Sequence, residues 1–289
     1  MSRTEISKRY NKLSKSEFLL FRDYIVNCCG ICIPQEKDYL FETRLSGLMN
    51  DMGVKSFSEL YKMLISETDS QLHQNVVDAI TTNETLWFRD EAPWKYIEEI
   101  ALPELVEAIL SGKKNRVRIW SAAVSTGQEA YSTVMCVEEY LKKNKIVGVD
   151  LSNFEFFATD ISSRVIDAAK KGSYDKHSIS RGLSEYYKGK YFTKNCSVWD
   201  IAPEIRNAVR FMSFNLMNDY RVFGLFDIIF CRYVLIYFAE SIQREIIIRM
   251  RDSLVDGGVL FTGNYAMHDL LNEFYELRHF NNFTYYVKK

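Results

Sequence analysis

A chain of 289 residues with 47% hydrophobic side chains is large enough to bury a full core, as a globular protein does. Its 37 basic and 38 acidic side chains nearly cancel, which excludes a basic nucleic-acid footprint. The charged start, "MSRTEISKRYNKLSK", excludes a signal peptide, and the longest apolar run, "FDIIFCRYVLIYFA", is too short to span a bilayer. We therefore expect a cytoplasmic protein without an integral membrane segment.

Residues 12–80 are predicted to form an all-helical N-terminal domain. Ser14 and Glu17 have capping-box spacing before an apolar run that ends at Gly30. Apolar residues at helical spacing recur in three further stretches, which begin after Pro34, at Ser56 and near Ser70. Four short amphipathic helices with brief connections make a small bundle.

Residues 81–289 are predicted to form an α/β domain with a doubly wound, mostly parallel sheet. Apolar runs alternate with helical stretches, which is typical of such sheets. The runs are "VRIWSA", "FEFFATD", "VRFMSF", "FDIIFCR" and "GGVLFTGN". "DGG" at 256–258 reads as a turn before the last run, and "FNNFTYYVKK" predicts a C-terminal hairpin at an antiparallel edge. Residues 173–206 interrupt the alternation and are predicted to be a small inserted β-subdomain.

Polar side chains follow several of these strands where parallel sheets bind ligands. "RIWSAAVSTGQEAYS" (118–132) has one glycine and no lysine, but it places Glu129 in the first turn of a helix. Asp160 follows the next strand, where a carboxylate can accept bonds from two ribose hydroxyls, and Asn215 follows the third. Two carboxylates without a phosphate cradle predict a nucleoside cofactor that lacks phosphates, such as S-adenosylmethionine.

A second polar cluster precedes the sheet in "TTNETLWFRDEAPW". The plainest interpretation is a loop between helices that buries Trp87 and Phe88. Asn83, Thr85 and Arg89 beside these aromatics argue for more, because buried polar groups need partners and an arginine can clamp a carboxylate. Each signal is weak alone, since strand-end carboxylates and Asn215 are also ordinary turn residues.

Taken together, these motifs resemble the chemoreceptor glutamate methyltransferases of bacterial chemotaxis, the CheR family, from about residue 12 to the end. The family's "TTNxTxFFR" reads "TTNETLWFR" here, and its "RIWSAACSTGEEPYS" reads "RIWSAAVSTGQEAYS". Its "ATDIS" and "NL" recur as "ATDIS" and "NLM". Its "FDxIFCRNVLIYF" and the strand after "GG" recur as "FDIIFCRYVLIYF" and "GGVLFTG". Because several long motifs recur in the same order, the resemblance to this family is specific.

The resemblance implies a function, a cofactor and a partner. It implies methyl transfer from S-adenosylmethionine to glutamate carboxylates of methyl-accepting receptors, which yields glutamyl methyl esters and S-adenosylhomocysteine. It implies cofactor contacts at Asn83, Thr85, Arg89, Glu129, Asp160, Asn215, Leu216, Arg232 and Tyr233. We expect Arg89 to hold the incoming carboxylate and Tyr237 to order its approach to the sulfonium; a merely packed Tyr237 is the alternative.

Three departures from the family pattern affect these expectations. Tyr233 stands where the family has Asn; either that side chain touches the cofactor or only the backbone does, and we favour the backbone. "YFTKNCSVWD" lacks the Gly-rich connection that some members use to bind a receptor tail, which argues against tail tethering. Lys37 and Arg44 remain on the second N-terminal stretch without further basic residues, which predicts that an electrostatic docking face is weaker or is placed elsewhere.

Other chemistries have less support in the sequence. The cluster "CCGIC" lacks a second Cys pair or His at ligand spacing, so we predict buried cysteines and no metal. A methyltransferase acting on RNA or a small molecule fits the near-neutral charge and the helical domain less well. A regulatory scaffold that binds S-adenosylmethionine or S-adenosylhomocysteine with reduced or lost catalysis stays open as the alternative, because of Tyr233.

Overall fold

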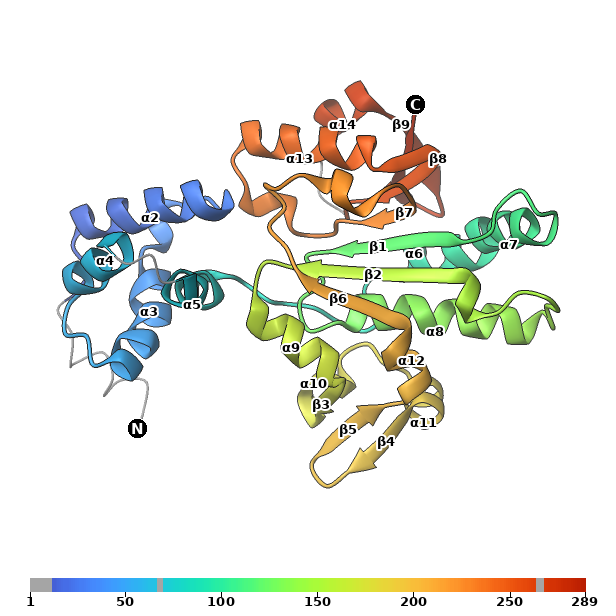
Figure 1. Cartoon of the computed structure of the whole chain (residues 1–289), viewed down its shortest axis with the longest axis horizontal. Coiled ribbons are helices and arrows are strands. Elements are labelled where there is room, and N and C mark those ends of the chain that lie inside the picture. The colour runs from blue at the N-terminus through green and yellow to red at the C-terminus, as the bar shows by residue number, and fades with distance from the viewer. Residues whose placement is uncertain (1–11, 67–69, 264–267) are drawn as a thin grey trace.

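The structure, a computed structural model, describes residues 12–66, 70–263 and 268–289. Figure 1 shows a group of N-terminal helices beside a larger sheet whose faces are covered by helices. A small second sheet projects from the larger part, beyond the edge strand β6. No helix among the described residues is both long and apolar enough to cross a membrane.

Among the described residues, the N-terminal part has four α-helices, which pack around their own core. These are α2 (Lys15–Cys29), α3 (Tyr39–Met52), α4 (Phe57–Ser66) and α5 (Ser70–Ile80), with a 3₁₀ turn η1 (Gln35–Lys37) before α3. Ser14 and Glu17 form the predicted capping box, and Gly30 ends α2 in the left-handed conformation at φ 75°. The buried stripes meet at Phe21, Phe41 and Leu60, so this part has a hydrophobic core independent of the sheet.

The larger part is the predicted doubly wound α/β sheet. Its strand order is β6-β2-β1-β7-β8-β10-β9, with all neighbours parallel except the two pairs that involve β10. The strands are β1 (Val117–Ala122), β2 (Phe154–Asp160), β6 (Val209–Ser213), β7 (Phe226–Phe230), β8 (Leu254–Phe261), β9 (Tyr275–Phe280) and β10 (Phe283–Lys288). The chain order reverses between β1 and β7, which makes their carboxyl ends the expected ligand position.

Helices cover both faces of this sheet. Neighbouring residues on a strand point to opposite faces, so each strand contributes side chains to both cores. Ile119 faces the layer of α8 (Gln128–Lys143) and α9 (Ser163–Lys171), whereas Trp120 faces α13 (Glu240–Asp252). Helix α14 (His268–Phe274) lies on the α13 side and α12 (Pro203–Ala208) on the other (Figure 1). Short 3₁₀ turns complete the connections: η3 (Leu151–Asn153), η4 (Tyr220–Phe223) and η5 (Leu235–Tyr237).

The C-terminal hairpin is confirmed, and one turn is corrected. Asn281 and Asn282 have φ angles of 45° and 60°, as a two-residue hairpin turn requires, and they join β9 to β10. "DGG" at 256–258 does not precede the last parallel strand but lies inside β8, where the register against β7 shifts. Gly257 takes φ 76° there, so the glycine accommodates a bulge and not a connection.

Residues 173–201, within the predicted insertion at 173–206, contain a small second sheet. Strands β3 (Ser173–Asp175), β5 (Val198–Ile201) and β4 (Phe192–Asn195) make a three-stranded antiparallel sheet in that order. Two short helices, α10 (Lys176–Ser180) and α11 (Glu185–Tyr191), stand between β3 and β4. β4 pairs with β5 across a two-residue turn, Cys196 and Ser197, so the connection is short.

Helices at residues 91–110 escaped the sequence interpretation. α6 (Glu91–Tyr96) continues through a π-helical turn η2 (Ile97–Ala101) into α7 (Leu102–Leu110). Pro93 and Pro103 obscure the pattern, but both stand near the start of a helix, where a missing N–H does little harm. This segment buries Trp94 and Ile97 against the sheet and fixes the loop before it.

Candidate active site

A cavity of about 560 Å³ lies beyond the carboxyl ends of the parallel strands, at the reversal between β1 and β7. Eight of the ten predicted site residues line it: Asn83, Arg89, Asp160, Asn215, Leu216, Arg232, Tyr233 and Tyr237. Thr85 and Glu129 line a narrow adjoining recess that shares Arg89, Arg232 and Tyr233 with the cavity. The structure therefore brings together motifs that are up to 154 positions apart, from Asn83 to Tyr237.

The N-terminal part supplies a wall of this cavity that the sequence did not reveal. Ile33, Tyr39 and Leu40 line it opposite the sheet, and Tyr39 is 53% exposed at the rim. Ile236 from the loop after β7 also lines it and is 42% exposed. Such contacts between distant segments leave no local signal. The mouth of the cavity therefore carries apolar side chains from both parts of the chain, beside exposed charged ones such as Lys37 and Glu84.

Backbone contacts join the helical part to the sheet, and Arg44 does not form the expected docking surface. The Cys32 N–H donates to the Tyr237 carbonyl at 2.7 Å, and Ile31 forms an isolated antiparallel β-bridge with Phe238. Arg44 donates to the Ile80 carbonyl and to the Thr82 hydroxyl, so it fixes the connection before the site and is not a free docking charge. The cysteines of "CCGIC" were predicted to be buried, which holds for Cys29, whereas Cys28 is half-buried and Cys32 is exposed.

The loop between β1 and α8 approaches the cavity with a strained backbone. Ala123 and Ser125 have φ angles of 57° and 54°, a region that non-glycine residues seldom adopt, and Gly127 follows at 93°. A Cβ on Gly127 would lie 3.0 Å from the Ala169 side chain, so glycine is needed for packing as well. Such strain persists where the surroundings impose it, which is common at functional loops.

Asp160 ties this loop to the end of β2. Its two carboxylate oxygens accept the N–H groups of Ser125 at 2.8 Å and Ser162 at 3.0 Å. Burial raises the pKa of Asp160, and these two N–H groups counteract the rise. Each oxygen keeps a lone pair, and the side chain lines the cavity, so the carboxylate can still accept bonds from a ligand hydroxyl.

Asp160→Ala is expected to weaken binding of S-adenosylhomocysteine at least about tenfold, because the ligand hydroxyls lose their acceptor. It should also lower the free energy of unfolding by about 1–3 kcal/mol, since the Ser125 and Ser162 N–H groups lose a partner. Calorimetric titration and urea unfolding measure the two effects. Asp167→Ala, at an exposed position of α9, is the control. Unchanged affinity in Asp160→Ala would remove Asp160 from the binding set.

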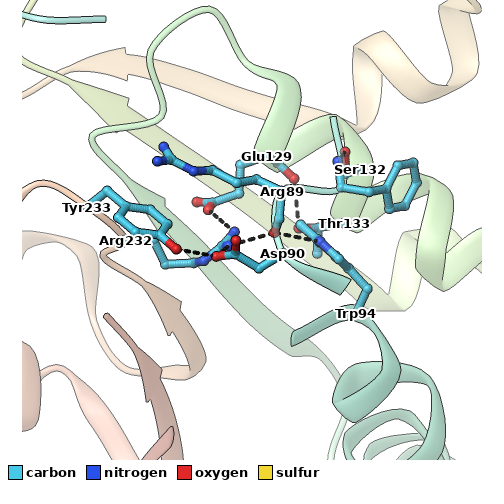
Figure 2. A network of polar contacts seen from close by, with 9 residues as sticks. Arg89, Asp90, Trp94, Glu129, Ser132, Thr133, Arg232 and Tyr233 are labelled. Carbon is cyan, nitrogen blue, oxygen red and sulfur yellow. Dashed lines mark hydrogen bonds and ion pairs between the residues drawn. The ribbon is translucent and has the colours of Figure 1, made fainter. Parts of the chain in front are cut away.

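Arg232 is the centre of a buried network that Figure 2 shows. Its side chain is 2% exposed, and it donates to Glu129 at 3.0 Å and to Asp90 at 2.7 Å. A further bond of 2.6 Å reaches the Arg89 carbonyl. Burial raises the pKa of Glu129, and the neighbouring Arg232 charge counteracts the rise. Asp90 was missed from the sequence, although it directly follows Arg89 in the motif.

Arg89 and Tyr233 stack on each other at the junction of cavity and recess. The Arg89 Cζ lies 3.6 Å from the centroid of the Tyr233 ring, and the Tyr233 hydroxyl donates to Asp90 at 2.5 Å. The Tyr233 side chain is thus engaged within the protein, and the expectation that only the backbone at this position touches the cofactor stays a prediction. Among the described residues, no carboxylate forms an ion pair with the Arg89 guanidinium, so its donors can receive one.

Asn215 and Tyr237 lie at the boundary between the two parts of the chain. The Asn215 amide donates to the Cys28 carbonyl at 2.8 Å and accepts from the Met217 N–H at 2.9 Å. This amide therefore joins α2 to the end of β6 in addition to lining the cavity. Tyr237 ends the 3₁₀ turn η5 and is half-buried against the same cavity.

The residues present fit S-adenosylmethionine. Asp160 lines the cavity and Glu129 lines the recess, so each supplies a carboxylate that can accept from a hydroxyl or pair with a cationic group of the cofactor. The volume of about 560 Å³ suits a ligand of nucleoside size. Asp160 would hold the ribose, and Glu129 with Arg232 would face the amino-acid end.

Comparisons with known proteins identify the family of the chain. The family described as "CheR methyltransferase, all-alpha domain" matches residues 16–81, and "CheR methyltransferase, SAM binding domain" matches residues 83–282. Chemotaxis protein methyltransferase 1 of Pseudomonas aeruginosa is 40% identical over 91% of this chain and 94% of its own length. Chemotaxis protein methyltransferase Cher2 of Pseudomonas putida is 38% identical over 90% and 94%. Chemotaxis protein methyltransferase 1 of Vibrio cholerae is 36% identical over 87% and 89%.

Together these matches cover both parts of the chain and include every predicted site residue. The cofactor is S-adenosylmethionine, and the fold is an all-α N-terminal domain joined to a Rossmann-like, class I methyltransferase sheet. The chain belongs to the CheR family of methyltransferases.

Proposed function

We propose that this protein methylates glutamate side chains in the cytoplasmic domains of chemoreceptors, forming glutamyl methyl esters. The observation that carries this proposal is the Arg89 guanidinium, which lies on the Tyr233 ring at the junction of cavity and recess. Its planar fork matches a carboxylate acceptor. The names of the relatives, chemotaxis protein methyltransferases, support a receptor of that pathway as the partner.

Exposed apolar side chains at the rim of the cavity support a protein acceptor. Tyr39 and Ile236 are exposed at the cavity mouth and come from different parts of the chain. A receptor helix lying across this rim would present its glutamate to Arg89 and cover apolar surface of both parts. The short turn between β4 and β5 offers no long loop for a receptor tail, so we propose direct docking without tail tethering.

The chemistry needs little from the protein beyond placement. When bound, S-adenosylmethionine supplies a methyl group attached to a positively charged sulfur. A glutamate acceptor has a reference pKa near about 4.3 and is already ionised at neutral pH, so no general base is needed. Alignment of two reactants can lower a barrier by roughly 7–11 kcal/mol. Arg89 would hold the acceptor carboxylate, Tyr237 would order its approach, and Asp160 and Glu129 would fix the cofactor.

Transfer of a labelled methyl group to a receptor cytoplasmic fragment tests this function. We expect label in the fragment with the wild-type protein and loss of label when the fragment's acceptor glutamates are replaced by alanine. Calorimetry with S-adenosylhomocysteine is the parallel check on the site. Binding without transfer would overturn the proposed enzyme and favour the regulatory scaffold.

Tyr237→Phe is expected to lower kcat about tenfold, equivalent to about 1.4 kcal/mol, while the affinity for S-adenosylhomocysteine stays the same. The reason is that the hydroxyl, at the cavity wall, orders the acceptor, whereas the ring alone preserves packing. Single-turnover kinetics with saturating cofactor measure the change. Tyr186→Phe, on the exposed face of α11, is the matched control. Full activity in Tyr237→Phe would show that Tyr237 is only a packed aromatic.

A further inference from the structure

Tyr233 has a backbone conformation that its side chain does not favour. Its φ angle is 58°, in the left-handed region that aromatic residues rarely occupy and that Asn tolerates better. A tyrosine persists there when its surroundings hold the ring in place. The position therefore raises the question of what the ring does that a smaller side chain would not.

The ring is held in place on several sides. Gly263 makes room for it, since a Cβ at that glycine would lie 3.1 Å from the Tyr233 ring. The hydroxyl donates to Asp90 at 2.5 Å, and the same Asp90 oxygen accepts from Arg232 at 2.7 Å. The ring is thereby anchored to the buried Arg232–Glu129 pair, as Figure 2 shows.

One face of the anchored ring carries Arg89. The Arg89 Cζ lies 3.6 Å from the ring centroid, well inside the range of a cation–π contact. The Arg89 backbone is fixed separately, because its carbonyl accepts from Arg232 at 2.6 Å and from the Trp94 indole at 3.1 Å. Without the ring, the backbone would stay in place and the long Arg89 side chain would gain rotamers.

We propose that Tyr233 is a positioning residue, which holds the Arg89 guanidinium in the orientation that receives the acceptor carboxylate. This inference rests on the proposed function of Arg89. Tyr233 acts through Arg89. Its hydroxyl is linked through Asp90 and Arg232 to Glu129, which lines the cofactor recess. A smaller residue at this position needs another way to orient the arginine.

Tyr233→Asn and Tyr233→Phe separate positioning from structure. Asn removes the ring but suits the left-handed backbone, so a purely structural role predicts equal or greater thermal stability and unchanged activity. If the Tyr233 ring positions Arg89, the activity should fall instead. We expect kcat with a receptor fragment to fall about 30-fold in Tyr233→Asn, about 2 kcal/mol, and about threefold in Tyr233→Phe, which keeps the stacked ring. The affinity for S-adenosylhomocysteine should change less than about threefold in both.

A spectroscopic readout tests the same contact without turnover. In ¹H–¹⁵N spectra of arginine side chains, the Arg89 Nε–H signal, assigned with Arg89→Lys, should be shifted by the ring current in the wild type and in Tyr233→Phe. In Tyr233→Asn it should move to the position of an exposed arginine such as Arg116. An unmoved signal, or equal activity of the Asn variant and the wild type, would overturn the proposal.

The outcomes also separate this proposal from the proposed function. If the wild-type protein fails to methylate the receptor fragment, the function fails, yet the Arg89 signal still reports whether Tyr233 orients it. If the wild type is active and Tyr233→Asn is equally active with a shifted signal, the function stands and positioning is overturned. A drop in activity with an unshifted signal overturns positioning as well.

Discussion

Replacing Arg89 with alanine is expected to abolish detectable methyl transfer while the protein still binds S-adenosylhomocysteine. The guanidinium lies at the junction of cavity and recess without an ion-pair partner among the described residues, which leaves its donors for the acceptor. Removing one preorganised donor of this kind lowers kcat by about 100-fold to 1,000-fold. Labelled methyl transfer under single-turnover conditions measures the loss, and calorimetry measures the remaining affinity.

Two further variants make this experiment specific. Arg89→Lys keeps the charge but loses the planar fork, so we expect an intermediate loss. Arg116→Ala changes an exposed arginine just before β1, at the end of the strand away from the cavity, and should behave as the wild type. Near-normal turnover in Arg89→Ala would eliminate the assigned role. A complete loss of cofactor binding would instead place Arg89 in the cofactor site alone.

Arg232→Met is expected to lower the free energy of unfolding at pH 7 by about 3–5 kcal/mol. It leaves Glu129 and Asp90 without the guanidinium that they share, and breaking a buried pair by removing one partner is strongly destabilising. Urea unfolding followed by far-ultraviolet circular dichroism measures the change. Arg221→Ala, which removes an exposed ion pair to Asp219, is the control and should unfold at the same urea concentration as the wild type.

The deficit of Arg232→Met should depend on pH. Burial already raises the pKa of Glu129, and the loss of Arg232 removes a charge that opposes this rise. A carboxyl whose pKa is raised on folding is stabilising below its unfolded pKa and loses that contribution as pH increases through the folded pKa. The deficit should therefore be smaller near pH 5 than at pH 8. A deficit that is constant across this range would show that Glu129 is not the affected group.

The sequence was sufficient for the features that depend on local pattern. Strand ends at Ala122 and Asp160 followed from apolar runs, and the hairpin at Asn281 followed from its turn residues. Parallel strands place their carboxyl ends at one edge, so Glu129, Asp160 and Arg232 could be predicted to gather. Helices at 91–110 were missed because Pro93 and Pro103 interrupt the apolar spacing, although both fit the first turns.

Other features depend on contacts across long sequence distances, and no local pattern encodes them. Asp90 meets Arg232 and Tyr233 across more than 140 positions, and neither its neighbours nor its spacing signals this. The amide of Asn215, expected to face the cofactor, is also bound to Cys28 in α2, because the packing of the helical part against the sheet decides its partner. Arg44 was similarly expected at a docking surface and is bound to Ile80 instead.

The chemical nature of the product tests the central claim most directly. The protein is incubated with S-adenosylmethionine carrying a labelled methyl group and a receptor cytoplasmic fragment, and the modified fragment is then exposed to mild alkali. A glutamyl methyl ester releases its label as volatile methanol, whereas a methylated nitrogen retains it. We expect the label to leave as methanol from the wild-type reaction and Arg89→Ala to incorporate none. Label that stays on the fragment after alkali would contradict this expectation.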